Sequence, residues 1–530
     1  MKPGEIAHSV SRGAFYLAAE KAVALLSGVL YFALLLRCLG PTKYGIITLA
    51  LSFVGLASMA TGNFEVYLER YTAEHEAQGR LLTLRRAQRL ALTLKLVLGG
   101  LAGTVLVAIA PLLASNFSTP ELATLLPLLA LIVVCDGLST TGRAVLYGFQ
   151  RFRWICSLSV VFHIAKTVMV GMLWWTRQGL LQLAVGLTVL TTIQGVVQCA
   201  VPLWMLRDAR DTGAAPGEIA PPGPRGGLLR SMLAYCTPLL GARIAFLSGQ
   251  NLSKVVLGKL FALSDLGYFS FAFQTVERFV ELAYTLPSAL MPSFTKLVAR
   301  GESDRLRWVF DQSFRLIQVT ACALSFGLFV FAPELTRWVG SPLFEPAVPL
   351  LRIMALVPFA RTAQQPFTMM FQAMRWPSAV LTLALVKFAV EFGCYFTLIP
   401  TVGLAGAGWA NLAGAVIAFA GAHLVLRRAL PAGAGERARA TLKGLGLLAV
   451  FMAAGWAIDG ALAGAAATAV KLLLVPPAVV AVFATGLVTP YDLEKVSSVP
   501  LRVAWMRRTR DSAVAAGDRL ARAVALRRSP

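Results

Sequence analysis

Long apolar stretches separated by short polar segments run along the chain from near its start to residue 488. Most are at least as long as the about 20 residues that an α-helix needs to cross the hydrocarbon layer of a bilayer. A transmembrane β-barrel would instead show short segments of alternating polarity. The pattern predicts an all-α integral membrane protein with about fourteen transmembrane helices. These spans lie near residues 13–39, 44–64, 90–114, 122–147, 155–174, 179–206, 231–258, 265–291, 313–332, 345–370, 377–399, 403–426, 442–460 and 464–488.

One stretch of this pattern occurs twice. Residues 127–154 and residues 349–376 both begin Pro-Leu-Leu and end Phe-Gln-x-x-Arg-Trp, an ending that is typical of anchors at the membrane interface. The copies are 222 residues apart, and the same offset pairs Gly45 with Gly267 and Lys21 with Arg243. Agreement of separate landmarks on one offset indicates two related halves of the same orientation, that is, parallel repeats.

Composition agrees with a membrane protein, since 57% of the residues are hydrophobic and 14% are charged. In a soluble chain the net charge of +23 would favour a nucleic-acid partner, but here the topology explains it. With the N-terminus inside, 32 of the 49 Lys and Arg residues fall in inside segments and four in outside loops. Because cytoplasmic loops are rich in Lys and Arg, both termini are expected in the cytoplasm and no nucleic acid is expected as a partner.

These features predict two six-helix lobes followed by two further helices. The N-lobe covers residues 1–206 and the C-lobe residues 231–427, joined by a cytoplasmic linker at 207–230 whose Gly, Pro and charge content is typical of flexible connections. A basic cytoplasmic loop at 428–441 precedes the last two spans, within 442–488. The basic tail at 489–530 is predicted to be either an amphipathic helix on anionic lipid or disordered.

Motifs for catalysis, cofactors and metals are absent from the sequence. It contains no GxxxxGK[ST] loop, and the glycines at 403, 406 and 408 lie within a predicted span, where they favour helix packing. The four histidines and seven cysteines match no metal-ligand spacing. We therefore expect no catalytic residue, no cofactor and no metal.

Charged residues inside the predicted spans are the candidate functional groups, because an ionisable group in a membrane is costly. Six bases near span ends have side chains long enough to reach the interface: Arg37, Lys95, Arg143, Lys254, Arg315 and Arg352. The bases nearest mid-depth are Lys21, Lys166, Arg243, Arg278, Arg361 and Lys387. The acids at comparable depth are Glu20, Asp136, Glu277, Glu281 and Glu391.

The excess of bases predicts an anionic ligand such as a pyrophosphate, which Arg and Lys bind well. Lys21 and Arg243 are the leading pair, since repeat-related positions would face each other across a pseudo-two-fold axis. The alternative is that each base pairs with a carboxylate.

The acids are candidates for binding a coupling ion. Glu277 and Glu281 are four residues apart on one helix face, and a like-charged pair there would need a proton or a cation. For Lys387 and Glu391, which have the same spacing, a structural ion pair and a role in transport remain equally open.

Two segments carry a family resemblance: RCLGPTKYGIITLALSFVGL at 37–56 and KLFALSDLGYFSFAFQ at 259–274. With the central basic linker and the span count, they resemble the polysaccharide-exporter branch of the MOP superfamily, the Wzx-type lipid-linked oligosaccharide flippases. The resemblance implies a MATE-like, V-shaped bundle around a cationic cavity. It also implies alternating access coupled to a gradient of H⁺ or Na⁺.

The predicted function is a flippase, and not an enzyme, that moves undecaprenyl-pyrophosphate-linked oligosaccharide across the bacterial inner membrane. The six mid-depth bases would bind the substrate, and the five acids would bind the coupling ion. Expected partners are the lipid-linked oligosaccharide, membrane lipids, and a polysaccharide polymerase and co-polymerase. A lipid II flippase and a MATE-like drug/cation antiporter remain open. A membrane polymerase or ligase is disfavoured by the short outside loops.

Overall fold

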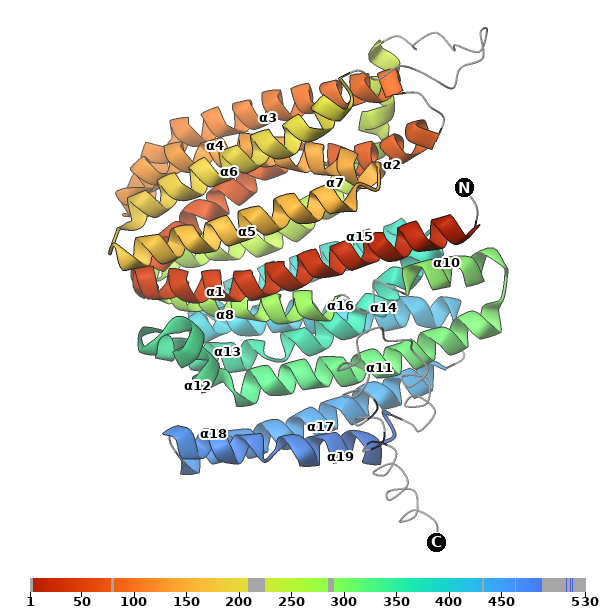
Figure 1. Ribbon diagram of the computed structural model, residues 1–530. Coiled ribbons are helices and arrows are strands. Elements are labelled where there is room, and N and C mark those ends of the chain that lie inside the picture. Colours follow the sequence, from red (N-terminus) through yellow and green to blue (C-terminus); the bar gives the residue numbers. More distant parts are fainter. Residues whose placement is uncertain are drawn as a thin grey trace. The chain divides into compact units, whose positions relative to one another are not determined.

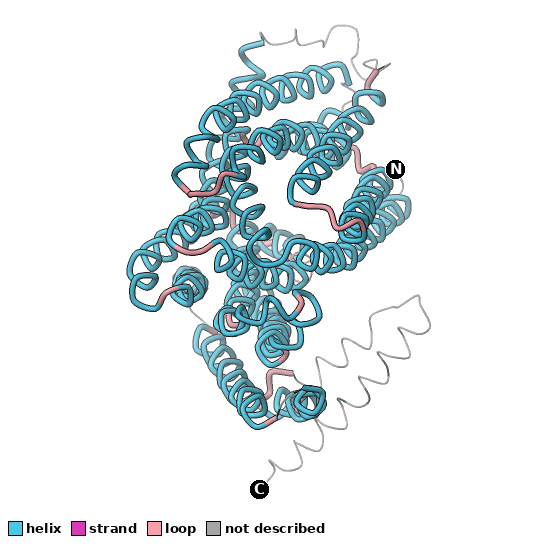
Figure 2. The backbone as a smooth tube through the Cα atoms, turned by 90° about the vertical axis from the view of Figure 1, so that its left-hand side faces the viewer, coloured by secondary structure: helices cyan, strands magenta, loops and turns pink. Residues whose placement is uncertain are grey.

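The computed structural model describes residues 3–77, 81–207, 225–284, 290–430, 433–462 and 464–488, with Asp511, Ala515 and Gly517. Residues 208–224 of the linker predicted at 207–230, and nearly all of the predicted tail, lie outside these residues, whereas the end of the predicted linker, from Arg225, already belongs to helix α7 (Arg225–Leu260). Within the described part of the chain there are helices and loops but no strand (Figure 2). This confirms the prediction of an all-α protein.

Ten helices of the described residues are long and apolar enough to cross a membrane, or eleven if one bent pair counts as a span. The predicted number of fourteen is therefore not confirmed. One reason is that α1, at Pro3–Ser58, runs through two predicted spans and leaves helical geometry only at Gly40, where φ is 68°. The other is that α7 (Arg225–Leu260) and α8 (Leu263–Ala283) are not among the ten.

The bent pair replaces a single predicted span. The first part of the pair comprises residues 342–354 and ends in α13 (Val348–Met354). The second part is α14 (Val357–Ala373), and the angle between the two is 41°. Pro358 follows directly after this break, at the second position of α14. A proline there has no N–H to donate to the preceding turn, so the two helices cannot continue as one without losing a hydrogen bond.

The chain divides into two compact units. Unit 1 comprises Met1–Phe271 and Trp338–Phe344. Besides α1, α7 and the start of α8, its elements are η1 (Met59–Thr61), α2 (Phe64–Ala77), α3 (Leu81–Asn116), α4 (Glu121–Gly148), α5 (Phe152–Trp175) and α6 (Leu180–Met205). In Figure 1, α4 lies between α3 and α6, and α1 packs against α5. Gly142 and Gly195 let α4 and α6 approach until backbone touches backbone.

Unit 2 comprises Ala272–Arg337 and Glu345–Pro530. After the end of α8, its elements besides α13 and α14 are α10 (Met291–Ala299), α11 (Ser303–Val330), α12 (Ala332–Leu335), α15 (Pro377–Val402), α16 (Leu404–Ala429), α17 (Ala434–Ala461), α18 (Gly464–Leu472) and α19 (Val475–Ala484). The short η2 (Thr336–Gly340) and η3 (Pro342–Ala347) contain the boundaries of Trp338–Phe344, which belongs to unit 1. Helix α11 packs against both α14 and α17, and α15 packs against α16. Edge-to-face contacts of Phe367 with Phe310 and Phe314, at 5.3 Å between ring centroids, fill the space between α11 and α14.

Gly45 and Gly267 occupy equivalent positions in the two repeats. Each of them packs against the segment that contains the other. A Cβ atom on Gly45 would overlap the carbonyl oxygen of Leu263, and one on Gly267 would overlap the carbonyl oxygen of Pro41. The backbones of α1 and of the start of α8 therefore cross in direct contact within unit 1. Phe32 stacks on Phe271 beside this crossing, at 6.0 Å between ring centroids.

Candidate functional site

Five charged side chains of unit 1 form the candidate site, which we name the charged cluster: Glu65, Lys95, Asp136, Lys166 and Arg243. They come from α2, α3, α4, α5 and α7 in turn. Glu65 lies in the first turn of α2, immediately after a break at Gly62, where φ is 77°. Such a conformation suits glycine alone, and it turns the chain so that α2 begins with its carboxylate facing the other helices.

Glu65 links two bases of the cluster. Lys95 Nζ donates to Glu65 Oε2 at 2.6 Å and to Thr140 Oγ1 at 2.7 Å, and the Lys95 side chain is only 1% exposed. Arg243 donates to the other carboxylate oxygen of Glu65 and to Asn63 Oδ1, the latter at 2.8 Å. Arg243 also donates to the carbonyl of Gly62 at 3.3 Å. The guanidinium thus satisfies a carbonyl that the helix break leaves without a helical partner.

Electrostatics give the cluster a surplus of positive charge. Burial alone would raise the pKa of the Glu65 carboxyl, but Lys95 and Arg243 outweigh burial and hold the pKa below its ordinary value. Glu65 is therefore ionised at neutral pH. Asp136 interacts electrostatically with Lys95, Arg243 and Lys166, and it forms no side-chain hydrogen bond with a described residue. Three bases face two acids, so the cluster favours an additional anion.

Lys21, which the repeat pairs with Arg243, is exposed. Its neighbour Glu20 is buried and accepts a bond from Arg143 at 2.7 Å, while the Lys21 side chain is exposed on α1. No hydrogen bond or ion pair between described residues joins Lys21 to Arg243 or to a carboxylate. Adjacent helix positions point in different directions, which is why Glu20 neutralises Arg143 and leaves Lys21 accessible.

In unit 2, the two acids at 277 and 281 have separate basic partners. Arg361 pairs with Glu277 and donates to the Tyr284 hydroxyl at 3.3 Å. Glu281 accepts from Arg278 at 3.0 Å, and both of these side chains are exposed. Each carboxylate is compensated by an arginine, so the spacing of four residues does not create the uncompensated acidic pair that the sequence suggested.

Glu391 is a fully satisfied buried carboxylate. It accepts from Lys387 at 2.8 Å, from Asn411 at 2.7 Å and from the Tyr395 hydroxyl at 3.1 Å, and it is 1% exposed. Of the two interpretations left open for Lys387 and Glu391, the geometry shows the ion pair.

The sequence does not indicate the roles of two members of the charged cluster, Lys95 and Glu65. Lys95 was interpreted as a base near a span end, because the predicted span began at residue 90, whereas α3 begins at Leu81 and places Lys95 well inside the helix. Glu65 fell one residue beyond the predicted span at 44–64. The helix-prone, charged residues before Leu90 were the signal that α3 extends farther.

A second network that the sequence did not indicate lies in unit 2. Lys471, which is fully buried, contacts Glu334 at 2.8 Å and Asp459 at 2.5 Å, and Asp459 also pairs with Arg352. Two bases meet two acids, so the network is neutral and ties α18 and the end of α17 to α12 and α13. Glu334 and Asp459 lie at the ends of the predicted spans at 313–332 and 442–460. An acid at a span end is ordinary, so its position does not indicate a buried ion pair.

No group of three or more His, Cys, Asp and Glu side chains within the described residues is placed to hold a metal ion. Taken together, the long apolar helices and the ionic groups buried among them define a multi-pass helical membrane protein.

Comparison with known proteins narrows this class. Residues 34–349 match the family described as polysaccharide biosynthesis protein. The chain is 22% identical over 436 residues to stage V sporulation protein B of Bacillus subtilis (strain 168), covering 77% of this chain and 81% of that protein. The chain therefore belongs to the polysaccharide biosynthesis protein family.

Two solved structures show the fold. An inward-facing multidrug resistance MATE family transporter of the MOP superfamily aligns with a TM-score of 0.62 at 14% identity, over 78% of this chain and 98% of that one. The lipid II flippase MurJ in an inward closed conformation aligns with a TM-score of 0.57 at 12% identity, over 82% and 92%. The predicted MOP-superfamily fold is confirmed, and of these two neighbours one is a transporter and the other a flippase.

Proposed function

We propose that the protein is a flippase that moves an undecaprenyl-pyrophosphate-linked oligosaccharide from the cytoplasmic to the outer leaflet of the bacterial inner membrane. Its product would serve exopolysaccharide, O-antigen or capsule synthesis. The observation that carries the proposal is the charged cluster of unit 1, where three bases meet two acids among apolar helices. Membership of a polysaccharide biosynthesis family supports this class of substrate.

Arg243 and Lys166 bind the pyrophosphate in this proposal, and exposed Lys21 attracts it. Glu65 sets the availability of Arg243, because its carboxylate binds both Arg243 and Lys95. Neutralising Glu65 would release Arg243 toward a phosphate, which a guanidinium binds through two parallel hydrogen bonds. Asp136, which interacts electrostatically with the three bases, binds the coupling ion, H⁺ or Na⁺. The bases at 278, 361 and 387 and the acids at 20, 277, 281 and 391 remain further candidates.

The positive-inside distribution supports cytoplasmic termini and an inner-membrane location. A polysaccharide polymerase and its co-polymerase would act on the transported unit after it crosses. The chain itself would break no covalent bond.

The test is transport of a fluorescent lipid-linked oligosaccharide in proteoliposomes. Losing one charge-assisted hydrogen bond costs about 1.5–3 kcal/mol, so Arg243→Ala should slow transport by roughly 10-fold to 100-fold. Lys21→Ala should lower the apparent affinity for the substrate. Arg89→Ala, an exposed base on α3 outside the charged cluster, is the matched control. Normal transport by a folded Lys21→Ala/Arg243→Ala protein would contradict the proposal.

A lipid II flippase is the second candidate, favoured by the fold shared with MurJ. Lipid II carries the same pyrophosphate, so the charged cluster does not separate the two substrates. Competition does: unlabelled lipid II should compete poorly with the oligosaccharide if our first proposal is right. A drug/cation antiporter would prefer a site with surplus acid, which the charged cluster does not provide.

A further inference from the structure

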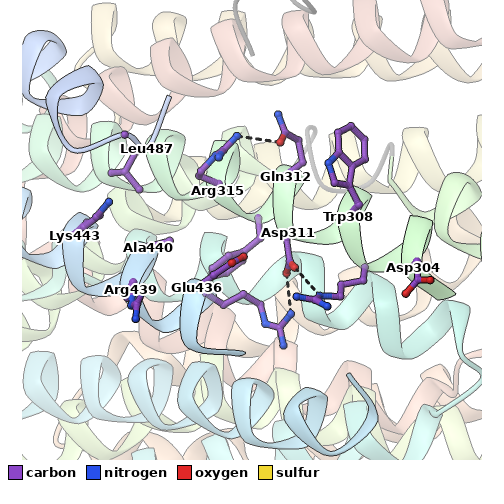
Figure 3. Close-up of a pocket in the computed structure, with 14 residues that line it drawn as sticks. Asp304, Trp308, Asp311, Gln312, Arg315, Glu436, Arg439, Ala440, Lys443 and Leu487 are labelled. Carbon is purple, nitrogen blue, oxygen red and sulfur yellow. Dashed lines mark hydrogen bonds and ion pairs between the residues drawn. The ribbon is translucent and has the colours of Figure 1, made fainter. Parts of the chain in front are cut away.

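Asp136 lacks the ion pair that other acids among the helices have. In a pocket of unit 2, for example, Asp311 contacts Arg437 at 2.8 Å and Arg307 at 3.6 Å, as the dashed lines in Figure 3 show. Asp136 forms no ion pair with a described residue. Charged groups on four other helices nevertheless interact with it electrostatically: Glu65 on α2, Lys95 on α3, Lys166 on α5 and Arg243 on α7. Its carboxylate is therefore able to accept a new partner.

The ammonium group of Lys95 is bound beside the helical turn that carries Asp136. Lys95 Nζ has three N–H groups to donate, and it uses two of them among the described residues, toward Glu65 and Thr140. The Lys95 side chain crosses α4 at Gly137, the residue after Asp136. A Cβ atom at Gly137 would lie 3.3 Å from the Cβ and 3.6 Å from the Cδ of Lys95. The third N–H group is thus left for another acceptor on this part of α4.

Thr140 fixes the position of this ammonium group. Its Oγ1 donates to the carbonyl oxygen of Asp136 at 2.8 Å, which leaves the lone pairs of the hydroxyl to accept from Lys95 at 2.7 Å. Asp136 and Thr140 are four residues apart and so share one face of α4. Lys95 can therefore turn toward Asp136 while it keeps its bond to Thr140.

The charge on Asp136 decides how many carboxylates attract Lys95. While Asp136 holds a proton or a cation, Glu65 is the one uncompensated acid of the charged cluster that faces Lys95. When Asp136 is ionised and empty, two carboxylates compete for an ammonium group that is 1% exposed and needs a counter-ion. Because Arg243 binds the same Glu65, a shift of Lys95 toward Asp136 leaves Glu65 to Arg243 alone.

We propose that Thr140 is a positioning residue that holds Lys95 between Glu65 and Asp136, so that the ammonium group changes carboxylates when the coupling ion leaves Asp136. The inference rests on the proposed function, in which Asp136 binds the coupling ion and Arg243 the pyrophosphate. Ion binding at Asp136 returns Lys95 to Glu65, and the shared carboxylate then holds Arg243 less tightly. Thr140 touches neither the ion nor the substrate and acts through Lys95.

Accumulation of labelled lipid-linked oligosaccharide in proteoliposomes tests this, under whichever gradient, H⁺ or Na⁺, drives the wild type. Thr140→Val keeps the shape of the side chain but removes the acceptor. The accumulation ratio should fall from roughly tenfold toward one, while the substrate still equilibrates between the leaflets. Thr140→Ser retains the hydroxyl and should keep the ratio. Thr141→Val is the matched control, because Thr141 donates to the carbonyl of Gly137 at 2.7 Å and does not contact Lys95.

Three outcomes overturn the proposal. Thr140→Val may not retain the accumulation ratio of the wild type. It also must not slow equilibration by the same factor by which it lowers accumulation, since that result indicates a structural role for the hydroxyl. Thr141→Val must not lose accumulation as Thr140→Val does, since that result assigns the effect to α4 as a whole.

A second measurement needs no substrate and separates this inference from the proposed function. Thr140→Val and Asp136→Asn both act on Lys95, so their effects on the unfolding equilibrium constant in mixed micelles should depart from additivity by about threefold or more. Thr141→Val and Asp136→Asn should be additive. Non-additivity in a wild-type protein that transports no lipid-linked oligosaccharide would reject the proposed function and retain the position of Lys95. Additive effects of Thr140→Val and Asp136→Asn would reject the present inference, even in a protein that transports.

Discussion

At the scale of single residues, Glu65 determines the character of the charged cluster. Its carboxylate accepts hydrogen bonds from Lys95, whose side chain is 1% exposed, and from Arg243. Arg243 also donates to Gly62 and Asn63 at the helix break before α2. Lys95 is almost fully shielded from bulk solvent, so the solvent cannot readily replace this partner. Removing one member of a buried ion pair leaves the other uncompensated, which costs far more than the pair itself contributes.

Glu65→Gln should therefore destabilise the protein by about 3–5 kcal/mol, because the buried Lys95 loses its counter-ion. Lys95→Met/Glu65→Gln should regain much of this loss, since the double variant removes both charges. Thermal unfolding of the purified protein in detergent measures the effect. Glu345→Gln is the control: its partner Arg337 and Glu345 itself are both about half exposed, so the loss should be within about 1 kcal/mol. Equal losses for the two single variants would contradict the buried role of Glu65.

Sequence reasoning found candidate residues more readily than it found their partners. Arg361 and Glu277 were both selected, yet the sequence paired Glu277 with Glu281, because only neighbours within a helix can be inferred from spacing. The partner chosen by the fold lies 84 residues away. Lys95 was misinterpreted for a related reason: the depth of a base was judged from the apolar span, and the polar start of α3 extended the helix beyond it.

At the scale of elements, hydropathy identified one of the helix breaks in this region and missed the next. The spans predicted at 13–39 and 44–64 leave a gap at Gly40, where α1 departs from helical geometry. Gly62, which separates η1 from α2, lies inside the second predicted span, because the apolar character does not change there. The repeat, in contrast, carried real packing information. Its paired glycines lie at a crossing where each would overlap the other segment's backbone if it had a side chain.

This crossing predicts a strong response to small substitutions. Gly45→Val and Gly267→Val should each destabilise the protein by about 3 kcal/mol or more, because backbone atoms cannot move aside as a flexible side chain can. Gly100→Val is the control, since a Cβ there has nothing within 4 Å; stability should change by well under 1 kcal/mol and in the stabilising direction, because Val has a higher helix propensity than Gly. Unfolding midpoints of the three variants provide the comparison. A tolerant Gly267→Val protein would show that the two segments do not pack through these glycines.

At the scale of the whole molecule, family membership and fold set the class of transporter, while the charge of the cluster bears on what it carries. The same fold serves a multidrug transporter and a lipid II flippase, so the architecture alone does not select a substrate. The surplus of bases is a local property, assembled from five helices of unit 1. The excess of bases over acids can be predicted from the sequence, but the positions of these residues relative to one another cannot.

That arrangement places Asp136 among three bases, where its charge state would alter the attraction for an anionic substrate. If H⁺ is the coupling ion, one pH unit supplies about 1.4 kcal/mol for each proton moved, enough for roughly a tenfold ratio of substrate between leaflets. Proteoliposomes with an imposed pH gradient should reach that ratio, and Asp136→Asn should lose it while still equilibrating the substrate. Glu121→Gln, an exposed acid in the first turn of the same helix, should behave as wild type. A sodium gradient that drives accumulation without a pH gradient would assign the coupling to Na⁺. An Asp136→Asn protein that still accumulates substrate would remove Asp136 from the coupling path.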